Sequence, residues 1–412
     1  MTEQSIEQRA DNVPVPRITV EAFCLNADLV QSIELAAQDR LMARARMSVN
    51  PGGISAAAEA FEERPSPPLV IVEALDGADV LLSQLDRLAE VCDAGTKVMV
   101  IGHENDIALY RELMRRGVSE YAVAPLAPRE IIAAIAAIYT DAGADKLGQV
   151  HAFIGAKGGA GSSTVAHNVA WTIGQRLGAD VVVADLDLAF GTAALGFNLE
   201  PAQGIAEAIQ DIGRLDRVLL ERLLARYDDH VSVLAAPARL DRPLEPDPAS
   251  IEALVEVAKA SVPITVLDLP PLWTSWGQRA LALADQVVIT AEPDLASLRN
   301  TKNIVGSLRQ SRPNDPPPRL VLNQVGMQKR PEIKPRDFAE ATGIEPTAVI
   351  PFEAGLFGTA ANNGQMIAQV SARSFAAEVF AQTASAITGR KEERRRKGGF
   401  GLGGLVRRLR KG

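Results

Sequence analysis

The sequence has few of the features that would place a protein outside the cell or within a membrane. Its 412 residues include two cysteines, Cys24 and Cys92, too few for a disulfide framework or a four-cysteine zinc site. The polar start, residues 1–16, lacks the apolar region of a secretory signal. Apolar stretches such as residues 131–139 are shorter than the ~20 residues that cross a bilayer. We therefore expect a cytoplasmic protein with a disordered N-terminus over residues 1–16.

Positive charge is outnumbered by negative charge except at the end of the chain. The net charge is -8, yet residues 390–412 contain ten Lys or Arg against Glu392 and Glu393. The acidic remainder would repel nucleic acid, which we do not expect as a partner. The basic tail, residues 390–412, also carries apolar residues such as Leu405 and Leu409, which favours contact with an anionic membrane surface. A solvated, disordered tail is the alternative.

The length exceeds the ~250 to 300 residues that one hydrophobic core serves, so we expect two domains. Apolar runs bounded by turn residues alternate with helical patterns from Arg17 onward, which predicts an α/β fold with parallel sheets. A small, polar, glycine-bearing segment at 141–148 is the predicted linker. We place the first domain at residues 17–140 and the second at 149–389, before the tail at 390–412.

Five strands are predicted in the first domain and seven in the second. The first five are residues 17–24, 45–49, 69–72, 98–102 and 120–124. The other seven are residues 150–155, 181–185, 231–234, 264–267, 286–290, 320–323 and 347–350. The second series is long enough for a doubly wound sheet, which binds ligands at the carboxyl ends of its strands.

A glycine-rich turn at residues 157–164 is the clearest indication of a ligand-binding site. It follows a predicted strand and precedes a helical pattern. Backbone N–H groups of such a turn crowd around phosphate, and the helix adds a positive dipole end. The residues expected to bind phosphate are Lys157, Gly158, Gly159, Ala160, Gly161, Ser162, Ser163 and Thr164. The alternative is a tight turn that binds no ligand.

The lysine in this turn lies at a different position from the lysine of the usual phosphate loop, which ends in Gly-Lys-Ser/Thr. Ser162 stands where that lysine belongs, Ser163 keeps the hydroxyl that holds Mg²⁺, and Lys157 lies at the start. The turn resembles the loop of the MinD/ParA family of deviant Walker ATPases, Lys-Gly-Gly-x-Gly-Lys-Ser/Thr. The resemblance implies ATP and Mg²⁺ as cofactors and a homodimer in which Lys157 reaches the partner's nucleotide. The serine implies weak or absent hydrolysis.

Three aspartates follow predicted strands, where they would face the ligand crevice of the sheet. By resemblance, Asp187 orients the attacking water and acts catalytically with Lys157, and Asp185 lies beside the metal. Asp268 follows an apolar strand and would hold Mg²⁺ through water, together with Ser163. The alternative is that these aspartates only cap turns or helices.

Two later segments match the positions where the family grips adenine. Asn323 ends one predicted strand, and Pro351 and Glu353 follow another. The resemblance implies an amide contact from Asn323 and backbone contacts from the loop at Pro351, with Glu353 in place of a more usual aspartate. An ordinary turn former is the alternative for Asn323.

The first domain resembles a response-regulator receiver domain with a flavodoxin-like sheet, but the matching positions lack its chemistry. Cys24-Leu25-Asn26 replaces an acidic pair, Glu73 stands at the phosphoacceptor position, and Ala124 replaces a lysine. We therefore predict a pseudo-receiver used for docking or dimerisation. An unrelated α/β adaptor is the alternative.

A receiver-like domain joined to a deviant ATPase is the layout of CpaE/TadZ proteins of the Tad (Flp) pilus system, and residues 292–300 are similar to theirs. The resemblance implies an ATP-binding, dimerising localisation or scaffold protein for pilus assembly or secretion. We expect it in the cytoplasm, with the basic tail as the part that would place it at the inner face of the cell membrane. Any turnover would be that of a slow Mg-dependent ATPase. The alternatives are an active partitioning ATPase and a nucleotide-independent structural hub.

Overall fold

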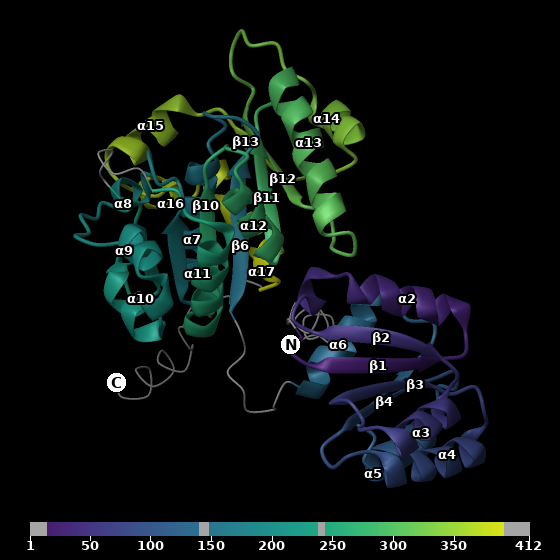
Figure 1. Ribbon diagram of the computed structural model, residues 1–412. Helices are drawn as coiled ribbons and strands as arrows, with labels where there is room; N and C mark the ends of the chain where they lie inside the picture. Colours follow the sequence, from purple (N-terminus) through teal and green to yellow (C-terminus); the bar gives the residue numbers. More distant parts are fainter. Residues whose placement is uncertain (1–14, 140–147, 238–243, 391–412) are drawn as a thin grey trace, which may run out of the picture.

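The computed structural model describes residues 15–139, 148–237 and 244–390, which form two α/β domains with separate sheets (Figure 1). The first sheet has five strands and the second has eight. The predicted N-terminal segment before residue 15, most of the linker and all of the basic tail except Arg390 lie outside the described residues.

The first domain is built on a parallel five-stranded sheet. Its strands are β1 (Thr19–Cys24), β2 (Arg46–Pro51), β3 (Leu69–Glu73), β4 (Lys97–Gly102) and β5 (Glu120–Val123). They are arranged in the order β2-β1-β3-β4-β5. This is the flavodoxin-like order 2-1-3-4-5, so the predicted fold class of the first domain is confirmed.

Helices cover both faces of this sheet. They are α2 (Ala27–Ala37), α3 (Ile54–Glu63), α4 (Ala78–Val91), α5 (Ile107–Arg115) and α6 (Pro128–Tyr139). Apolar residues of α2 and α6 pack on one face and those of α3, α4 and α5 on the other. In α4 the buried residues Leu81, Leu85 and Leu88 recur at helical spacing. All five residues of β3 are buried, as expected of a central parallel strand covered on both faces.

The second domain contains a doubly wound sheet with one antiparallel edge. Its strands are β6 (Gln149–Gly155), β7 (Val181–Asp185), β8 (Ala225–Arg226), β9 (Val231–Leu234), β10 (Ile264–Leu269), β11 (Gln286–Ala291), β12 (Arg319–Val325) and β13 (Pro346–Pro351). The order is β13-β12-β11-β6-β10-β7-β9-β8. All seven predicted strands are present. The two-residue β8, which pairs antiparallel with β9, was not predicted.

Eleven helices surround this sheet in the described residues. They are α7 (Ser162–Leu177), α8 (Ala193–Gly196), α9 (Ile205–Gln210), α10 (Arg217–Leu223), α11 (Pro248–Ser261), α12 (Ser275–Leu283), α13 (Leu295–Ser311), α14 (Pro335–Thr342), α15 (Ala354–Asn362), α16 (Ile367–Val370) and α17 (Phe375–Thr388). Helices α7 and α17 pack on one face, whereas α11, α12 and α13 pack on the other. None of these helices, nor any described helix of the first domain, has the length and apolar character to cross a membrane.

Candidate functional site

The glycine-rich turn connects β6 to α7, as predicted. Gly159 and Gly161 have φ angles of 83° and 84°, in the left-handed region that favours glycine. A Cβ on Gly161 would lie 2.4 Å from Nδ2 of Asn323, so a larger residue cannot replace it without displacing that side chain. The turn therefore depends on glycine both for its backbone conformation and for its close packing.

Three carboxamide side chains hold the carbonyl groups of this turn. Asn300, Asn323 and Gln324 each donate a hydrogen bond of 2.9 Å. The acceptors are the carbonyls of Ala156, Ala160 and Gly159, respectively. Because these carbonyls are engaged, the groups that remain for a ligand are mainly N–H donors, which suits an anion.

Ser162, the residue in place of the usual lysine, is the first residue of α7 and is buried. Its Oγ has no hydrogen-bond partner among the described residues. An unpaired buried hydroxyl is costly. At a helix N-terminus, a phosphate oxygen would satisfy this hydroxyl, so the residues of the turn fit the expected anion.

Lys157 is paired within its own chain. Its Nζ donates to Oδ2 of Asp294 at 2.6 Å and lies 3.3 Å from Oε1 of Glu292. The hydrogen bond to Asp294 raises the pKa of Lys157 above its ordinary value. The amine is therefore charged and held at the end of β11. Its reach to a partner's nucleotide stays a prediction.

Asp268 joins the strand end to the helix after the turn. It is buried near the end of β10, where Ser163 donates to its Oδ1 at 3.2 Å and His167 contacts its Oδ2 through Nε2 at 3.1 Å. His167 was not predicted. It lies four residues after Ser163 on α7, one helical turn along the same face. The predicted pair Ser163 and Asp268 is thus brought together, with His167 as an additional partner.

Asp185 lies beside Asp268 on the neighbouring strand and is also buried. Its carboxylate accepts backbone N–H groups from Asp187 at 3.2 Å and Ala193 at 2.9 Å. Burial raises the pKa of Asp185 to about 7, and the negative charge of Asp268 acts in the same direction. Two neighbouring buried carboxylates disfavour double ionisation, which a cation would relieve.

Asp187 is half-buried at the rim of this cluster. Its Oδ1 accepts the backbone N–H of Phe190 at 3.1 Å, which is the turn-capping arrangement considered as an alternative in the sequence. Capping of this kind still leaves acceptor capacity on the carboxylate. The role of Asp187 towards water therefore stays a prediction.

The oxygen atoms of Ser163, Asp185 and Asp268 are of the type that Mg²⁺ prefers. Among the described side chains, no group of three or more His, Cys, Asp or Glu is arranged to hold a metal ion. Magnesium is commonly held by one or two protein groups together with substrate phosphates and water. The cluster thus fits Mg²⁺ that arrives with a nucleotide better than a permanent metal centre.

The residues predicted to contact adenine lie at the ends of β12 and β13. Pro351 pairs in register with Val325, and Glu353 precedes α15 without a capping hydrogen bond from its side chain. Asn323 is buried, and its amide nitrogen is engaged by the Ala160 carbonyl as described above. The amide of Asn323 therefore supports the phosphate loop, and adenine contacts by these three residues stay predictions.

Comparison with known proteins shows the family of the chain. A pilus assembly protein CpaE from Caulobacter crescentus CB15 is 55% identical, over 31% of this chain and 98% of that chain, with a TM-score of 0.31. Sequence identity of this size over nearly all of the solved chain decides the family. The chain belongs to the CpaE family.

Over part of its length, the CpaE-family chain also shares its fold with MinD proteins. MinD from Pyrococcus horikoshii OT3, complexed with Mg-ADP, is 19% identical over 58% of this chain and 96% of that chain, with a TM-score of 0.51. MinD of Bacillus subtilis is 23% identical over 181 residues, 43% of this chain. That match spans 66% of the curated relative, just under two thirds. No family model matches the chain.

In the first domain of this CpaE-family chain, the acidic residue at the end of β3 has a structural role. Glu73 is buried, and its Oε2 accepts the N–H groups of Leu25 at 2.6 Å and Asn26 at 2.9 Å. Its Oε1 lies 3.1 Å from Nε2 of His103. Burial raises the pKa of the nearby Cys24 thiol to about 12, so this thiol stays protonated at neutral pH. Glu73 thus ties two loops together, and the receiver-like fold is present without the acidic pair and lysine of a receiver.

Proposed function

We propose that this CpaE-family chain binds ATP and Mg²⁺ at residues 157–164, dimerises, and acts as a localisation or scaffold protein in pilus assembly or secretion. The observation that carries the proposal is the buried, unpaired hydroxyl of Ser162 at the start of α7. It lies in a turn whose carbonyls are held by three carboxamides, so that N–H donors remain for phosphate.

Weak or absent hydrolysis is the second part of the proposal. The transition state of phosphoryl transfer depends on positive charge near the transferred group. Ser162 supplies a hydroxyl and no charge at the position of the usual lysine. Removing one such stabilising group typically costs a reaction about 3 kcal/mol or more. Lys157 from a partner is the cation that would restore part of this charge, so any turnover depends on dimerisation.

A homodimer is supported by apolar side chains exposed near the carboxyl ends of the strands. Phe190, Leu272, Trp273, Leu295 and Phe352 are all exposed. They follow β7, β10, β11 and β13, at the carboxyl ends of the strands, where the phosphate loop also lies. Exposed apolar groups on the rim of a polar site are typical of protein interfaces. A second copy placed here would cover them and bring its nucleotide towards Lys157.

The partner machinery and the membrane contact are further parts of the proposal. The solved Caulobacter relative is named a pilus assembly protein, which supports pilus proteins as partners. The basic tail supports peripheral contact with the inner face of an anionic membrane. An active partitioning ATPase, in which Lys157 and Asp187 suffice for hydrolysis, is the second candidate. It is favoured by the position of Asp187 beside Asp185 at the mouth of the site.

Light scattering with and without Mg-ATP tests the proposal. The wild-type mass is expected to double with Mg-ATP, and Lys157→Ala is expected to weaken this dimerisation at least tenfold. Lys302→Ala, at an exposed position on α13, is the matched control and should behave as wild type. Phosphate release measured on the same samples separates the two candidates. Dimerisation unchanged by Lys157→Ala would contradict the role of this lysine in the partner's site, and rapid phosphate release would favour the active ATPase.

A further inference from the structure

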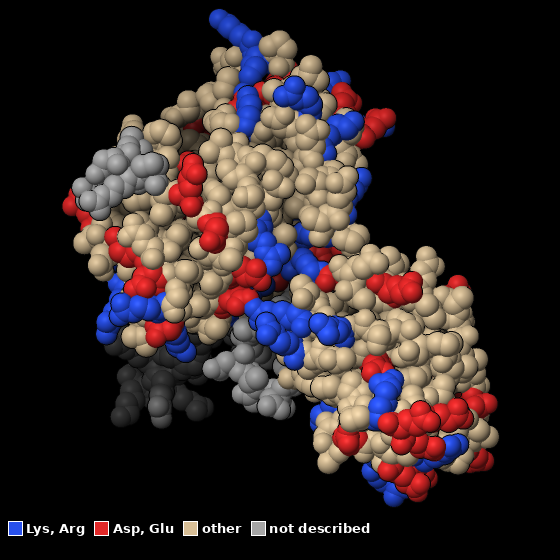
Figure 2. All heavy atoms as spheres, viewed as in Figure 1, with Lys and Arg blue, Asp and Glu red and all other residues tan. Residues whose placement is uncertain are grey.

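The contact between the two domains is polar. In the part of the chain that the structure describes, each apolar core contains residues of one domain only. Lys and Arg side chains gather where the domains meet (Figure 2). Interfaces within a chain that lack a large apolar contact generally permit domain motion. The attachment of the first domain therefore depends on a few charged groups.

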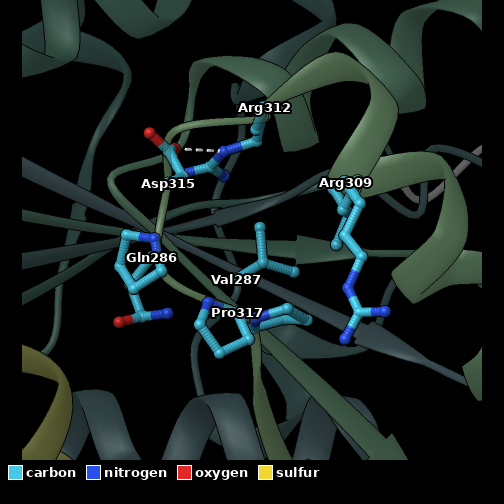
Figure 3. A pocket seen from close by; sticks show the side chains of 9 residues that line it. Gln286, Val287, Arg309, Arg312, Asp315 and Pro317 are labelled. Atoms are coloured by element: carbon cyan, nitrogen blue, oxygen red, sulfur yellow. Dashed lines mark hydrogen bonds and ion pairs between the residues drawn. The ribbon is translucent and has the colours of Figure 1, made fainter. Parts of the chain in front are cut away.

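Asp315, in the loop after α13, is the centre of this contact. Its side chain is 2% exposed, and it pairs with Arg40 at 3.1 Å and with Arg129 at 2.7 Å, both from the first domain. Arg312 of its own domain makes a third pair (Figure 3). Burial alone would raise the pKa of Asp315, but these guanidinium groups outweigh burial and hold the pKa below its ordinary value. The carboxylate is thus ionised at neutral pH.

Two further contacts join the domains. Asn314 donates through Nδ2 to Oδ2 of the buried Asp39 at 3.0 Å, and Arg44 pairs with Glu256. Arg44 and Glu256 are about half exposed, so their contribution is small. The buried cluster on Asp315 is different, because removing one partner of a buried ion pair leaves uncompensated charge.

Helix α13 joins this cluster to the candidate nucleotide site. At its N-terminus, Asp294 caps the helix by accepting the N–H of Ser297 at 2.7 Å and also binds Lys157. At its C-terminus, Arg312 donates to the carbonyl of Leu281 at 2.9 Å and pairs with Asp315. A helix of 17 residues spans about 25 Å. The residues at the two ends of one helix therefore contact Lys157 of the phosphate loop and the ion pairs between the domains.

We propose that the Asp315 cluster is a releasable latch between the domains, and that α13 couples it to occupancy of the phosphate loop. The coupling rests on the proposed nucleotide binding. When Lys157 turns towards phosphate, Asp294 loses its cation, and the N-terminal end of α13, still joined to the loop through Asn300, shifts with the loop. The other end then alters the position of Arg312 and Asp315 against the first domain. The latch itself rests on the pairs of Asp315 with Arg40 and Arg129, which join the two domains, and does not require nucleotide.

Amide hydrogen exchange measured by mass spectrometry tests the latch without nucleotide. Asp315→Asn is expected to raise exchange at least fivefold in residues 39–46 of the first domain. The exposed Asp337→Asn is the matched control and should leave exchange unchanged. The double variant Arg40→Met, Arg129→Met changes only the first domain, yet it should raise exchange in residues 309–315 of the second domain. Unchanged exchange in folded variants of both kinds would overturn the latch.

The same exchange measurement with Mg-ATP tests the coupling, with binding followed by calorimetry on the same protein. Wild-type chain is expected to bind Mg-ATP and to change exchange in residues 39–46 and 309–315 at least threefold. Binding without this change would overturn the coupling while leaving the proposed function intact. An absence of binding would overturn the proposed function and the coupling together, but not the latch. In Asp294→Asn, amide exchange in residues 39–46 and 309–315 should no longer change when nucleotide binds. A retained change would exclude α13 as the connection between the two sites.

Discussion

Replacement of Asp185 by asparagine should change how the stability of the second domain depends on pH. Asp185 is 1% exposed and lies beside Asp268. Its pKa is raised from 3.8 to about 7. Asparagine keeps the shape of the side chain and cannot ionise. The perturbation removes one ionisation and also the acceptor of one backbone N–H group, that of Asp187 or Ala193. The lost hydrogen bond lowers stability by the same amount at every pH, so the pH dependence reports the ionisation alone.

The magnitude follows from the pKa. One pKa unit corresponds to about 1.4 kcal/mol, so ionising Asp185 costs the folded domain about 4 kcal/mol. Between pH 4 and 7 the folded chain retains a proton that the unfolded chain has lost, so the free energy of unfolding falls as pH rises. The stabilising effect of this proton is complete when the pH is below the pKa of the unfolded chain. It is lost as the pH rises through the pKa of the folded chain. Between pH 5 and pH 8 we expect wild type to lose about 3 kcal/mol relative to Asp185→Asn.

Denaturant unfolding followed by tryptophan fluorescence measures this difference in the second domain alone. The three tryptophans of the chain, Trp171, Trp273 and Trp276, all lie in that domain. The comparison is made in metal-free buffer at pH 5, 6.5 and 8. The quantity compared is the change between pH 5 and pH 8 and not the difference at a single pH, because at pH 5 the unfolded chain has already lost the proton that the folded chain retains.

Parallel pH curves for wild type and Asp185→Asn would refute this reasoning, since they would show that the Asp185 carboxyl does not titrate near neutral pH. A variant that loses stability relative to wild type as pH rises would contradict the sign. A protonated Asp185 would also disfavour a nearby divalent cation below pH 7. Binding of Mg²⁺ with nucleotide is therefore expected to strengthen as pH rises through 7.

Three other changes have defined outcomes. Ser162→Lys is expected to raise phosphate release at least tenfold by restoring charge to the loop, and adding Asp187→Asn should cancel the gain; unchanged release would argue against Ser162 as the limiting position. Glu73→Ala leaves two backbone amides without an acceptor and should destabilise the first domain by about 2–4 kcal/mol in thermal unfolding, whereas the exposed Glu59→Ala should be neutral. Equal effects would refute the role of Glu73. Deleting residues 390–412 should abolish co-sedimentation with anionic liposomes, and retained binding would exclude the tail as the membrane contact.

Hydrophobic patterning was sufficient to predict most of the fold, because the central strands, such as β3, β7 and β10, are buried apolar runs between turn residues. All twelve predicted strands are present. The missing strand, Ala225–Arg226, has only two residues on a sheet edge and no pattern to detect. The order of strands in the first domain followed from the flavodoxin-like resemblance and not from the pattern itself.

The candidate site was predicted in part. Ser163 and Asp268 are in contact, as expected from a strand end facing a helix N-terminus. His167 was detectable in principle, because it shares a helical face with Ser163. The carboxamide contacts of Asn300 and Gln324 were not, because they join residues more than 140 positions apart and no local pattern marks them.

The charged contacts were the least accessible to sequence reasoning. Lys157 was expected to face a partner, whereas the structure pairs it with Asp294 and Glu292 of the same chain. Arg129 and Asp315 are 186 positions apart. Isolated surface charges of this kind are usually solvated, so their pairing depends on how the folded domains meet.

Calorimetric titration of Mg-ATP into the full chain tests the central claim most directly. We predict saturable binding with one nucleotide per chain in wild type, and loss of binding in Gly161→Val, since this glycine has a φ of 84° and lies against Asn323. Gly213→Ala, at a position with open space around it, is the control and should bind as wild type. Absence of saturable heat in wild type, or equal binding by Gly161→Val, would contradict a nucleotide site at residues 157–164.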